Sequence, residues 1–248
     1  MTIISFKNIS KSFGNNNVVD NLSLDINEGE TITIIGGSGS GKSVLLKLLL
    51  GVLRSDAGRI YFRGRDITEM DEWELIDVRK NIGMLFQGSA LFDSLSVAEN
   101  IAYPLREHFK FPEDKLEAIV AEKLNLVGLA GIQQMMPNEL SGGMKKRVGL
   151  ARAIATDPKV ILYDEPTTGL DPANTMRINK LIRELQRKLR VTSIVVTHDM
   201  TSAFLVSDRI AMLYNRRIEF VGTVEDAKKS SNSVVQHFIQ GYIGEESA

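Results

Sequence analysis

The chain has 248 residues, of which 43% are hydrophobic and 25% charged, so its composition is that of a globular protein and not of a disordered one. A formal net charge of −1 argues against the broad positive field of a protein that binds duplex nucleic acid. The chain has no cysteine, which excludes disulfide bonds and thiolate metal sites and fits a reducing compartment.

Nothing near the N-terminus is typical of a targeting segment. Residues Met1–Lys7 have neither the basic region nor the sustained apolar region of a signal peptide. The longest apolar stretch, Val44–Leu53, contains Lys47 and is far shorter than the ~20 residues needed to span a bilayer. We therefore expect a soluble, cytosolic chain.

The first third of the chain is rich in short strand-like segments. Three of them open the sequence: Thr2–Asn8, the alternating residues Leu22, Leu24 and Ile26, and Thr31–Ile35. Their alternation of apolar and polar residues predicts a half-buried antiparallel layer. The following segments are predicted as a helix over Lys42–Leu53, a strand over Arg59–Arg63, a helix over Asp71–Lys80 and a buried strand over Ile82–Phe86.

The pattern changes to helices between Gly88 and about Thr156. The clearest helix is Pro112–Val127, in which apolar residues recur at helical spacing and the proline suits a first turn. We interpret this block as an inserted helical subdomain.

Strands and helices then alternate, which predicts a largely parallel sheet. The strands are Lys159–Tyr163, Thr192–Thr197 and Arg209–Leu213, and the helices between them are Pro172–Leu189 and Asp199–Val206. The final segment, Val224–Ala248, is polar with a small apolar stripe.

Residues Gly36–Ser43 match the phosphate-binding pattern G-x-x-x-x-G-K-[ST]. The buried strand before them and the helix after them are the context that this pattern requires, and an ordinary Gly/Ser turn would lack it. The loop that would cradle the phosphates with backbone N–H groups consists of Gly36, Gly37, Ser38, Gly39, Ser40 and Gly41. Lys42 would reach the β/γ oxygens, and the Ser43 hydroxyl would ligate Mg²⁺.

A second candidate site is the acidic pair that ends the apolar run Val160–Tyr163. Ligands of open α/β folds bind at the carboxyl edge of the parallel sheet, where this pair is expected. Asp164 would belong to the Mg²⁺ shell, and Glu165 would polarise the attacking water. An isolated Asp-Glu pair is more often a surface turn, but the phosphate-binding loop favours the functional interpretation.

Ser141, Gly142 and Gly143 precede the helical run Met144–Ala155. These residues suit either a simple helix N-cap or an anion site, because both use the free N–H groups of a helix N-terminus. The residues alone leave both interpretations open.

Six elements together resemble the ATP-binding subunits of ABC transporters. In chain order they are Walker A at Gly36–Ser43, Gln87 after a strand, Leu140–Met144, Walker B ending at Asp164-Glu165, Leu170–Pro172, and His198 after a strand. The resemblance extends from Phe6 to about Val221.

This resemblance implies an α/β fold: a P-loop NTPase (RecA-like) core with a mixed, largely parallel sheet, an antiparallel β-subdomain and an inserted helical subdomain. Residues 1–248 would form a single ABC ATPase domain. We expect residues 1–87 and 156–222 to form the catalytic core with the β-subdomain, 88–155 the helical subdomain and 223–248 a C-terminal helical tail.

The resemblance also assigns roles around the bound ATP. Phe13 would stack on the adenine, where the family more often has tyrosine; the alternative is a core phenylalanine. Gln87 would contact both Mg²⁺ and the attacking water, and the alternative is a solvated loop glutamine. His198 would hydrogen-bond the γ-phosphate and orient Glu165; the alternative is a structural histidine.

Other roles involve a second copy of the chain. Ser141, Gly142 and Gly143 would bind ATP held by the other protomer of a head-to-tail dimer, and Asp171 would lie at the dimer interface. Two histidines, His108 and His237, match no family motif and are expected at the surface. The basic run Lys145–Arg147 is expected to be a solvated helix face and not a nucleic-acid patch.

A narrower resemblance is to the ATPase subunits of Mla-type lipid transporters. It rests on Met84–Leu95, Ala102–Glu107 and Leu140–Arg147, including methionine after the signature glycines, where glutamine is commoner. It implies a membrane permease and a mammalian-cell-entry-domain protein as partners, phospholipid as the cargo, and a location on the cytoplasmic face of the inner membrane.

The same region is the expected permease contact. Leu91, Phe92, Leu95 and Tyr103 would form a partly exposed apolar groove for a permease helix, or else be core residues of the helical subdomain. The nearest alternative function is the ATPase of a polar-solute importer, for example one for amino acids. A chromosome-handling or translation-factor ATPase would need a coiled-coil insertion or a second nucleotide domain, and Glu165 and His198 argue against a nucleotide sensor without turnover.

Overall fold

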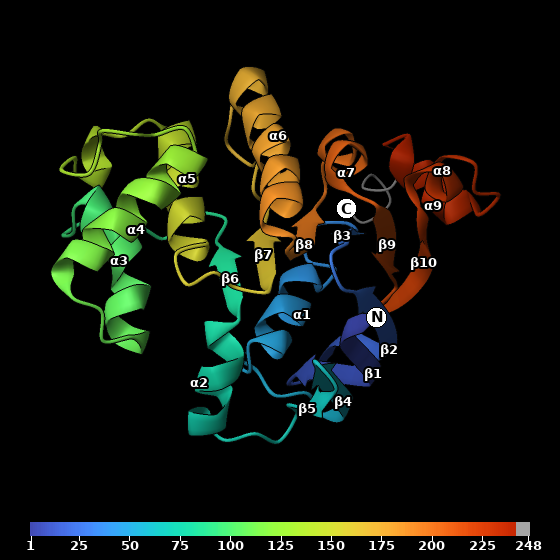
Figure 1. Cartoon of the computed structure of the whole chain (residues 1–248). Helices are drawn as coiled ribbons and strands as arrows, with labels where there is room; N and C mark the ends of the chain where they lie inside the picture. Colours follow the sequence, from blue (N-terminus) through green and yellow to red (C-terminus); the bar gives the residue numbers. More distant parts are fainter. Residues whose placement is uncertain (242–248) are drawn as a thin grey trace. The chain divides into compact units, whose positions relative to one another are not determined.

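The computed structural model describes residues 1–241, and the part of the predicted helical tail at 242–248 lies outside them (Figure 1). The chain divides into two compact units. The first contains residues 1–78 and the C-terminal part from Thr192, and the second contains Arg79–Val191. Each unit is described by itself.

The first unit contains an antiparallel sheet with the strand order β2-β1-β4-β5. Its strands are β1 (Thr2–Phe13), β2 (Asn16–Asn27), β4 (Ala57–Phe62) and β5 (Arg65–Asp66). Leu22, Leu24 and Ile26 of β2 are buried while the residues between them are exposed, so the predicted half-buried antiparallel layer is confirmed. β1 is longer than predicted because its pairing with β2 continues through irregularities to Phe13.

The same unit contains four strands in the order β10-β9-β3-β8. They are β3 (Thr31–Ile35), β8 (Thr192–Thr197), β9 (Arg209–Tyr214) and β10 (Arg217–Thr223). β3 runs parallel to β8 and β9, and every residue of β3 and β8 is buried, as in a sheet covered on both faces. The prediction that Thr31–Ile35 shares the antiparallel layer is therefore wrong.

Helices of the first unit are α1 (Lys42–Leu49), α2 (Glu72–Lys80, whose last two residues fall in the second unit), α7 (Met200–Val206), α8 (Val224–Lys228) and α9 (Ser233–Ile239). The apolar stripe predicted near the C-terminus is the buried face of α9. Its residues Val235 and Phe238 share a core cluster with Ile35, Ile210 and Met212. This cluster contains the last residue of β3, directly before the phosphate-binding loop.

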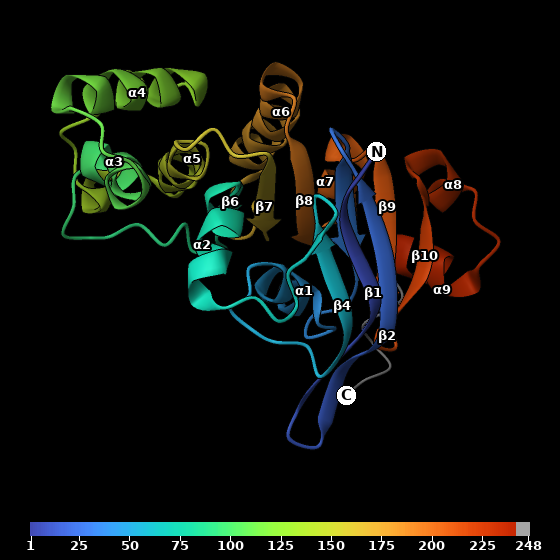
Figure 2. The same ribbon diagram turned by 60° about the horizontal axis from the view of Figure 1, so that its bottom comes forward.

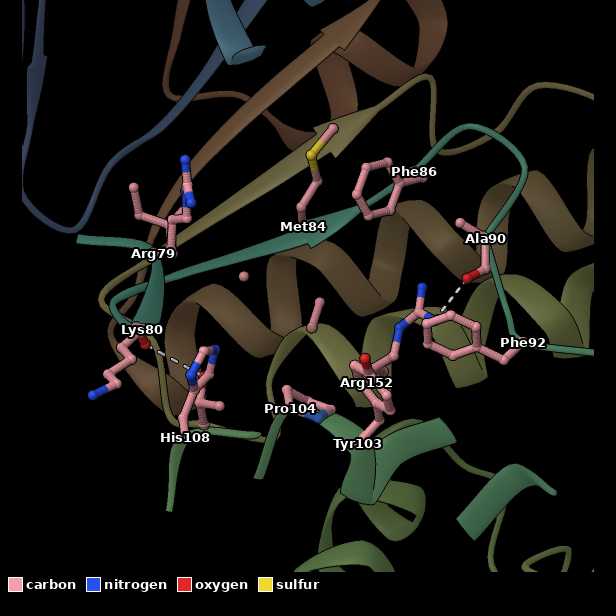
Figure 3. Close-up of a pocket in the computed structure, with 14 residues that line it drawn as sticks. Arg79, Lys80, Met84, Phe86, Ala90, Phe92, Tyr103, Pro104, His108 and Arg152 are labelled. Carbon is pink, nitrogen blue, oxygen red and sulfur yellow. Dashed lines mark hydrogen bonds between the residues drawn. The ribbon is translucent and has the colours of Figure 1, made fainter. Parts of the chain in front are cut away.

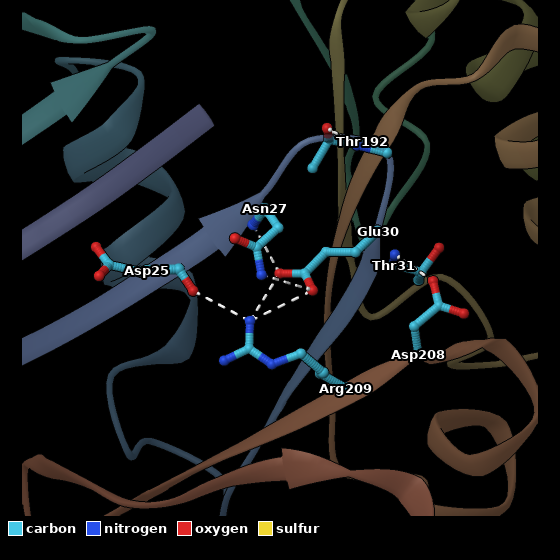
Figure 4. A network of polar contacts seen from close by, with 8 residues as sticks. Asp25, Asn27, Glu30, Thr31, Thr192, Asp208 and Arg209 are labelled. Atoms are coloured by element: carbon cyan, nitrogen blue, oxygen red, sulfur yellow. Dashed lines mark hydrogen bonds and ion pairs between the residues drawn. The ribbon is translucent and has the colours of Figure 1, made fainter. Parts of the chain in front are cut away.

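A polar network fixes the start of β3 (Figure 4). Arg209 on β9 donates to both carboxylate oxygens of Glu30, at 2.9 and 3.3 Å. Glu30 Oε1 also accepts from the backbone N–H of Asn27 at 2.7 Å, and the Thr31 N–H donates to Asp208 Oδ2 at 2.8 Å. The network therefore anchors both sides of the turn that leads into β3.

The second unit combines a parallel strand pair with helices. Strand β6 (Ile82–Leu85) runs parallel to β7 (Val160–Asp164). The helices are α3 (Val97–His108), α4 (Glu113–Leu126), α5 (Gly142–Ala153) and α6 (Pro172–Leu189), with a 3₁₀ turn, η1, at Pro137–Glu139. Figure 2 shows α3, α4 and α5 gathered in one group beyond β6. Among the described residues, no helix has the length and apolarity to cross a membrane.

Candidate functional site

The phosphate-binding loop joins β3 to α1 in the first unit, and its backbone is closely packed. A Cβ atom at Gly36 would lie 2.5 Å from the carbonyl oxygen of Leu213 and 2.8 Å from Ser40 Oγ, so only glycine fits there. The Ser40 N–H donates to the Gly37 carbonyl at 3.2 Å. Gly41, with a left-handed backbone, is the N-cap of α1. The loop is therefore tightly curled against β9.

Lys42 lies inside this curl. Its buried ammonium donates to the carbonyl oxygens of Gly36 and Gly37 at 2.7 and 2.8 Å. The first turn of α1 carries no acidic residue, and the buried Ser40 Oγ has no hydrogen-bond partner among the described residues. A buried ammonium, an unpaired hydroxyl and a helix N-terminus together fit the phosphates of a nucleotide. Ser43, half-buried in the first turn, lies where the sequence predicts a metal ligand.

Two further predicted residues belong to the first unit. Phe13 ends β1 with 46% of its surface exposed, so the alternative of a core phenylalanine is wrong. The Lys11 ammonium lies 5.5 Å from the centre of the Phe13 ring and 2.7 Å from a carboxylate oxygen of Asp56. His198 is exposed and directly follows β8. Both side chains are therefore open to a ligand.

The acidic pair belongs to the second unit, at the carboxyl end of β7. Asp164 is the last residue of that strand and is half-buried. Glu165 has a left-handed backbone with φ 48°, an uncommon conformation for a residue with a side chain. The Thr168 hydroxyl donates to Glu165 Oε2 at 3.2 Å, which orients the carboxylate.

Lys146 on α5 connects this pair to the loop after β6. The side chain is only 5% exposed, so the prediction that Lys145–Arg147 is a solvated helix face is wrong for this residue. Its ammonium donates to the carbonyl oxygen of Gln87 and, at 3.3 Å, to that of Glu165. Burial lowers the pKa of Lys146, and the charges of Asp164 and Glu165 oppose that shift. In the second unit, the backbone carbonyls of Gln87 and Glu165 are thus held by the same lysine side chain.

The signature segment and Asp171 are both helix N-caps. Ser141 Oγ accepts from the Met144 N–H at 3.3 Å at the start of α5, and Asp171 Oδ1 accepts from the Asn174 N–H at 2.9 Å at the start of α6. The bond from the Asn174 N–H lowers the pKa of Asp171. Ser141 therefore has the N-cap role that the residues alone allowed, and it is exposed together with Gly142.

A cavity of ≈ 430 Å³ opens in the second unit, between β6, α3, α5 and the end of α2 (Figure 3). Phe92 and Tyr103 line it, with 43% and 42% of their surfaces exposed and 4.8 Å between ring centres. They form part of the predicted apolar groove. Leu91 and Leu95 are not among the lining residues.

Basic as well as apolar side chains line the cavity. Arg79, Lys80 and Arg152 line it together with His108, and no lining residue is acidic. His108, which was expected at the surface, is half-buried in this wall. His237 is exposed, as predicted.

Arg152 on α5 holds the loop that forms one wall of this cavity. Its Nη1 donates to the Ala90 carbonyl at 2.7 Å and its Nη2 to the Ser89 carbonyl at 2.8 Å, while the guanidinium lies 5.8 Å from the centre of the Phe92 ring. Figure 3 shows the guanidinium beside the Phe92 ring. Sequence reasoning missed both Arg152 and Lys146. Their signal, two basic residues six positions apart on a predicted helix, is common on solvated helices.

The predicted site residues are divided between the two units. The phosphate-binding loop, Phe13 and His198 belong to the first unit, and Gln87, Ser141, Asp164, Glu165 and Asp171 to the second. Within the described residues, no group of three or more His, Asp or Glu side chains is placed to hold a metal ion.

Comparisons with known proteins identify the class. The sequence pattern of the family described as ABC transporter matches residues 19–168. The chain belongs to the ABC transporter family, as one of its ATP-binding subunits, and it is an enzyme that binds and hydrolyses ATP.

Relatives of two kinds are similar to this chain. The "Intermembrane phospholipid transport system ATP-binding protein MlaF" is 43% identical in Haemophilus influenzae and 40% identical in Escherichia coli K12, over 96% of this chain and 90% and 89% of those proteins. The "Probable ribonucleotide transport ATP-binding protein mkl" of Mycobacterium leprae is 43% identical over 96% of this chain and 69% of that protein. In Mycobacterium tuberculosis H37Rv the chain spans 66% of the corresponding protein.

Solved structures give the same fold. The ATP-binding cassette MJ0796, in a dimeric post-hydrolysis state with ADP and Pi, is 31% identical with a TM-score of 0.82, over 89% of this chain and 98% of that one. The protein cbiO1 from Clostridium perfringens, part of the transporter complex cbiONQ, is 29% identical with a TM-score of 0.85, over 95% of this chain and 94% of that one. The predicted α/β P-loop NTPase fold with a mixed, largely parallel sheet is therefore confirmed.

Proposed function

We propose that this ATPase powers phospholipid transport by a separate membrane permease, on the cytoplasmic face of the inner membrane and together with a mammalian-cell-entry-domain protein. The names of the Haemophilus and Escherichia relatives support this cargo. The observation that carries the proposal is the position of Met84–Leu95. This segment bears the resemblance to lipid-transporter ATPases, and Met84, Phe86, Ala90 and Phe92 line the cavity.

The proposed reaction takes place between two copies of the chain in a head-to-tail dimer. One copy would hold ATP with residues 36–43 and stack Phe13 on its adenine, while Ser141, Gly142 and Gly143 of the second copy would bind the γ-phosphate. Asp171 would lie at the interface between the copies. The structure of the MJ0796 cassette, a dimer bound to ADP and Pi, supports a dimeric ATPase. In each copy, residues 1–87 and 156–222 would act as catalytic core, 88–155 as helical subdomain and 223–248 as tail.

The chemistry would need groups from both units of one copy. Glu165, oriented by Thr168, would accept a proton from the attacking water, and His198 would hydrogen-bond the γ-phosphate and orient Glu165. Mg²⁺, when bound, would neutralise charge that develops on the phosphates; Ser43, Gln87 and Asp164 would hold it. ATP binding would close the dimer, and hydrolysis would reopen it.

The cavity of the second unit would receive a short permease helix. The exposed rings of Phe92 and Tyr103 favour an apolar contact with such a helix. The motion of the dimer would pass to the permease through this helix.

The first test of the docking is Phe92→Ala in the complex with the cognate permease. A central aromatic anchor usually contributes about 2 kcal/mol or more to an interface, so permease association should weaken and transport should uncouple while basal ATP hydrolysis stays nearly intact. Trp73→Ala is the matched control, because Trp73 is an exposed aromatic residue on α2 that does not line the cavity. Unchanged transport by the Phe92→Ala complex, or an unfolded variant, would contradict docking at this residue.

The ribonucleotide name of the mycobacterial relatives supports a second candidate cargo, in line with the polar-solute importer considered from the sequence. The ATPase and its permease, reconstituted in proteoliposomes, can be given a fluorescent phospholipid or a radiolabelled ribonucleotide or amino acid. The proposal expects ATP-dependent movement of the phospholipid alone, lost with Lys42→Ala. If a polar solute moved and the phospholipid did not, the proposal of phospholipid as the cargo would be wrong and the polar solute would take its place.

A further inference from the structure

We infer that Lys146 is a positioning residue for ATP hydrolysis: its ammonium holds the backbone of Glu165 in place and ties it to the backbone of Gln87. The inference rests on the proposed roles of Glu165 and Gln87. Lys146 is on α5, five residues after the Ser141 N-cap, and it reaches both carbonyl oxygens at once. It would not touch ATP, so its effect must pass through the two residues that it holds.

The Glu165 backbone needs such support. A residue with a side chain in the left-handed region is held at a cost on the order of 1 kcal/mol or more, and such strain persists only where surrounding contacts determine it. The Glu165 carbonyl accepts two hydrogen bonds, from the Thr168 N–H at 3.3 Å and from Lys146 at 3.3 Å. The first is local to the turn, and the second comes from another element, α5. Lys146 therefore fixes the direction in which the Glu165 side chain leaves the strand.

The Gln87 end is held by the same helix. A Cβ atom at Gly149 would lie 3.0 Å from a methyl carbon of Leu85 and 3.3 Å from the Ser89 carbonyl oxygen, so α5 passes unusually close to the loop after β6. Arg152, one turn further along α5, donates to the carbonyls of Ser89 and Ala90. The loop is thus fixed along α5, with Lys146 at the end nearest to Glu165.

Filling space does not explain a lysine at this position. An ammonium group loses its hydration when it is buried, and an unbranched apolar side chain such as methionine would occupy a similar volume without that loss. The two carbonyl oxygens that converge on the buried ammonium replace part of the hydration that it loses. The consequence is a direct link: a shift of the Gln87 backbone moves the donor that orients Glu165.

The test compares Lys146→Met with Lys146→Arg. Methionine keeps the volume but removes all donors, and arginine keeps the charge and can reach both oxygens. Because small displacements of a catalytic group reduce turnover strongly, kcat of Lys146→Met should fall on the order of 10- to 100-fold. The ATP dissociation constant and the melting temperature should stay close to the parent values, and Lys146→Arg should recover most of kcat. Lys145→Met, the same change at the half-buried neighbour, is the control.

A double variant separates this role from a structural one. If Lys146 acts through Glu165, Lys146→Met should slow the Glu165→Gln protein no further, because two residues acting as one unit are not additive. Three outcomes would each overturn the inference. Lys146→Met could have a normal kcat, it could lose ATP affinity and melting temperature without a change in kcat, or arginine at this position could fail to restore turnover. Full activity of Glu165→Gln alone would instead overturn the proposed function, so the two failures are distinguishable.

Discussion

The phosphate-binding loop and the loop over Gln87–Phe92 are held in different ways. The first is fixed largely by short-range contacts: it curls on glycines, it packs against Leu213 of β9, and its one cation, Lys42, comes from the next turn of the chain. The second is fixed from outside, by Lys146 and Arg152 of a helix about sixty residues further along the chain. The first loop is therefore visible as a local pattern, and the second depends on the packing of distant elements.

This difference assigns separate tasks to the two loops. A loop fixed by short-range contacts and by the strand beside it presents its N–H groups in one arrangement, which suits the binding of a small anion. A loop fixed by another helix moves when that helix moves, which suits the transmission of a permease contact to Glu165. Changes in the first loop should therefore affect nucleotide binding, and changes in the second should affect rate and coupling.

The largest expected effect is that of Lys42→Ala. It removes the buried cation of the phosphate-binding loop, so ATP binding should weaken and turnover should be abolished. Lys47→Ala, on the exposed face of the same helix, should hydrolyse ATP normally. Release of phosphate by the purified proteins measures both. Ordinary ATPase activity in a correctly folded Lys42→Ala protein is incompatible with the role of this loop.

Glu165→Gln should have the next largest effect. Glutamine keeps the size and most hydrogen bonds but cannot accept the proton, which should lower turnover on the order of 10²- to 10⁴-fold while ATP binding survives. We expect the variant to accumulate as an ATP-bound dimer, visible by size-exclusion chromatography with and without MgATP. Glu117→Gln, at an exposed position of α4, should behave like the parent protein. A variant that is monomeric and fully active would exclude Glu165 as the base.

The sequence was sufficient wherever the determinant is local or periodic. The helices over Pro172–Leu189 and Asp199–Val206, the strand at Thr192–Thr197 and the phosphate-binding loop all follow from patterns within one segment. The strands that pair with Thr31–Ile35 could not be predicted in this way, because strand pairing depends on residues far along the chain. Partner, cargo and shared-site roles came from the resemblance to a family.

The sequence-based prediction was least successful for the burial of charged residues. Lys145–Arg147 is typical of a solvated helix face, and nothing local distinguishes its middle residue. Lys146 is buried because the loop after β6, 59 residues earlier, lies against α5. Arg152 was missed for the same reason, because its hydrogen-bond partners are the carbonyls of Ser89 and Ala90. A single sequence shows which residues are cationic, but the carbonyl oxygens that receive their hydrogen bonds are backbone groups and carry no sequence signal.

The smallest expected effect is that of replacing Asn100, a residue of the same segment that holds the backbone of Phe92. Asn100 on α3 is fully buried, and its side-chain amide caps the turn before that helix. Its Nδ2 donates to the carbonyls of Phe92, Leu95 and Ser96 at 3.0 to 3.1 Å, and its Oδ1 accepts from the Phe92 N–H at 2.9 Å. Asn100 is therefore the local counterpart of Arg152 in holding the cavity wall.

Asn100→Leu keeps the volume but leaves these buried backbone groups without their partner, which should cost about 1–3 kcal/mol of stability. For a chain of this size each kcal/mol lowers the melting temperature by about 2–4 °C, so calorimetry should resolve the loss. Asn125→Leu, at an exposed position of α4, is the control and should change little. Because the nucleotide loop is fixed independently, ATP affinity at temperatures below the transition should remain that of the parent, while permease association weakens. An equal loss of ATP affinity would show that the two loops are not held separately, and the comparison on which these predictions rest would fail.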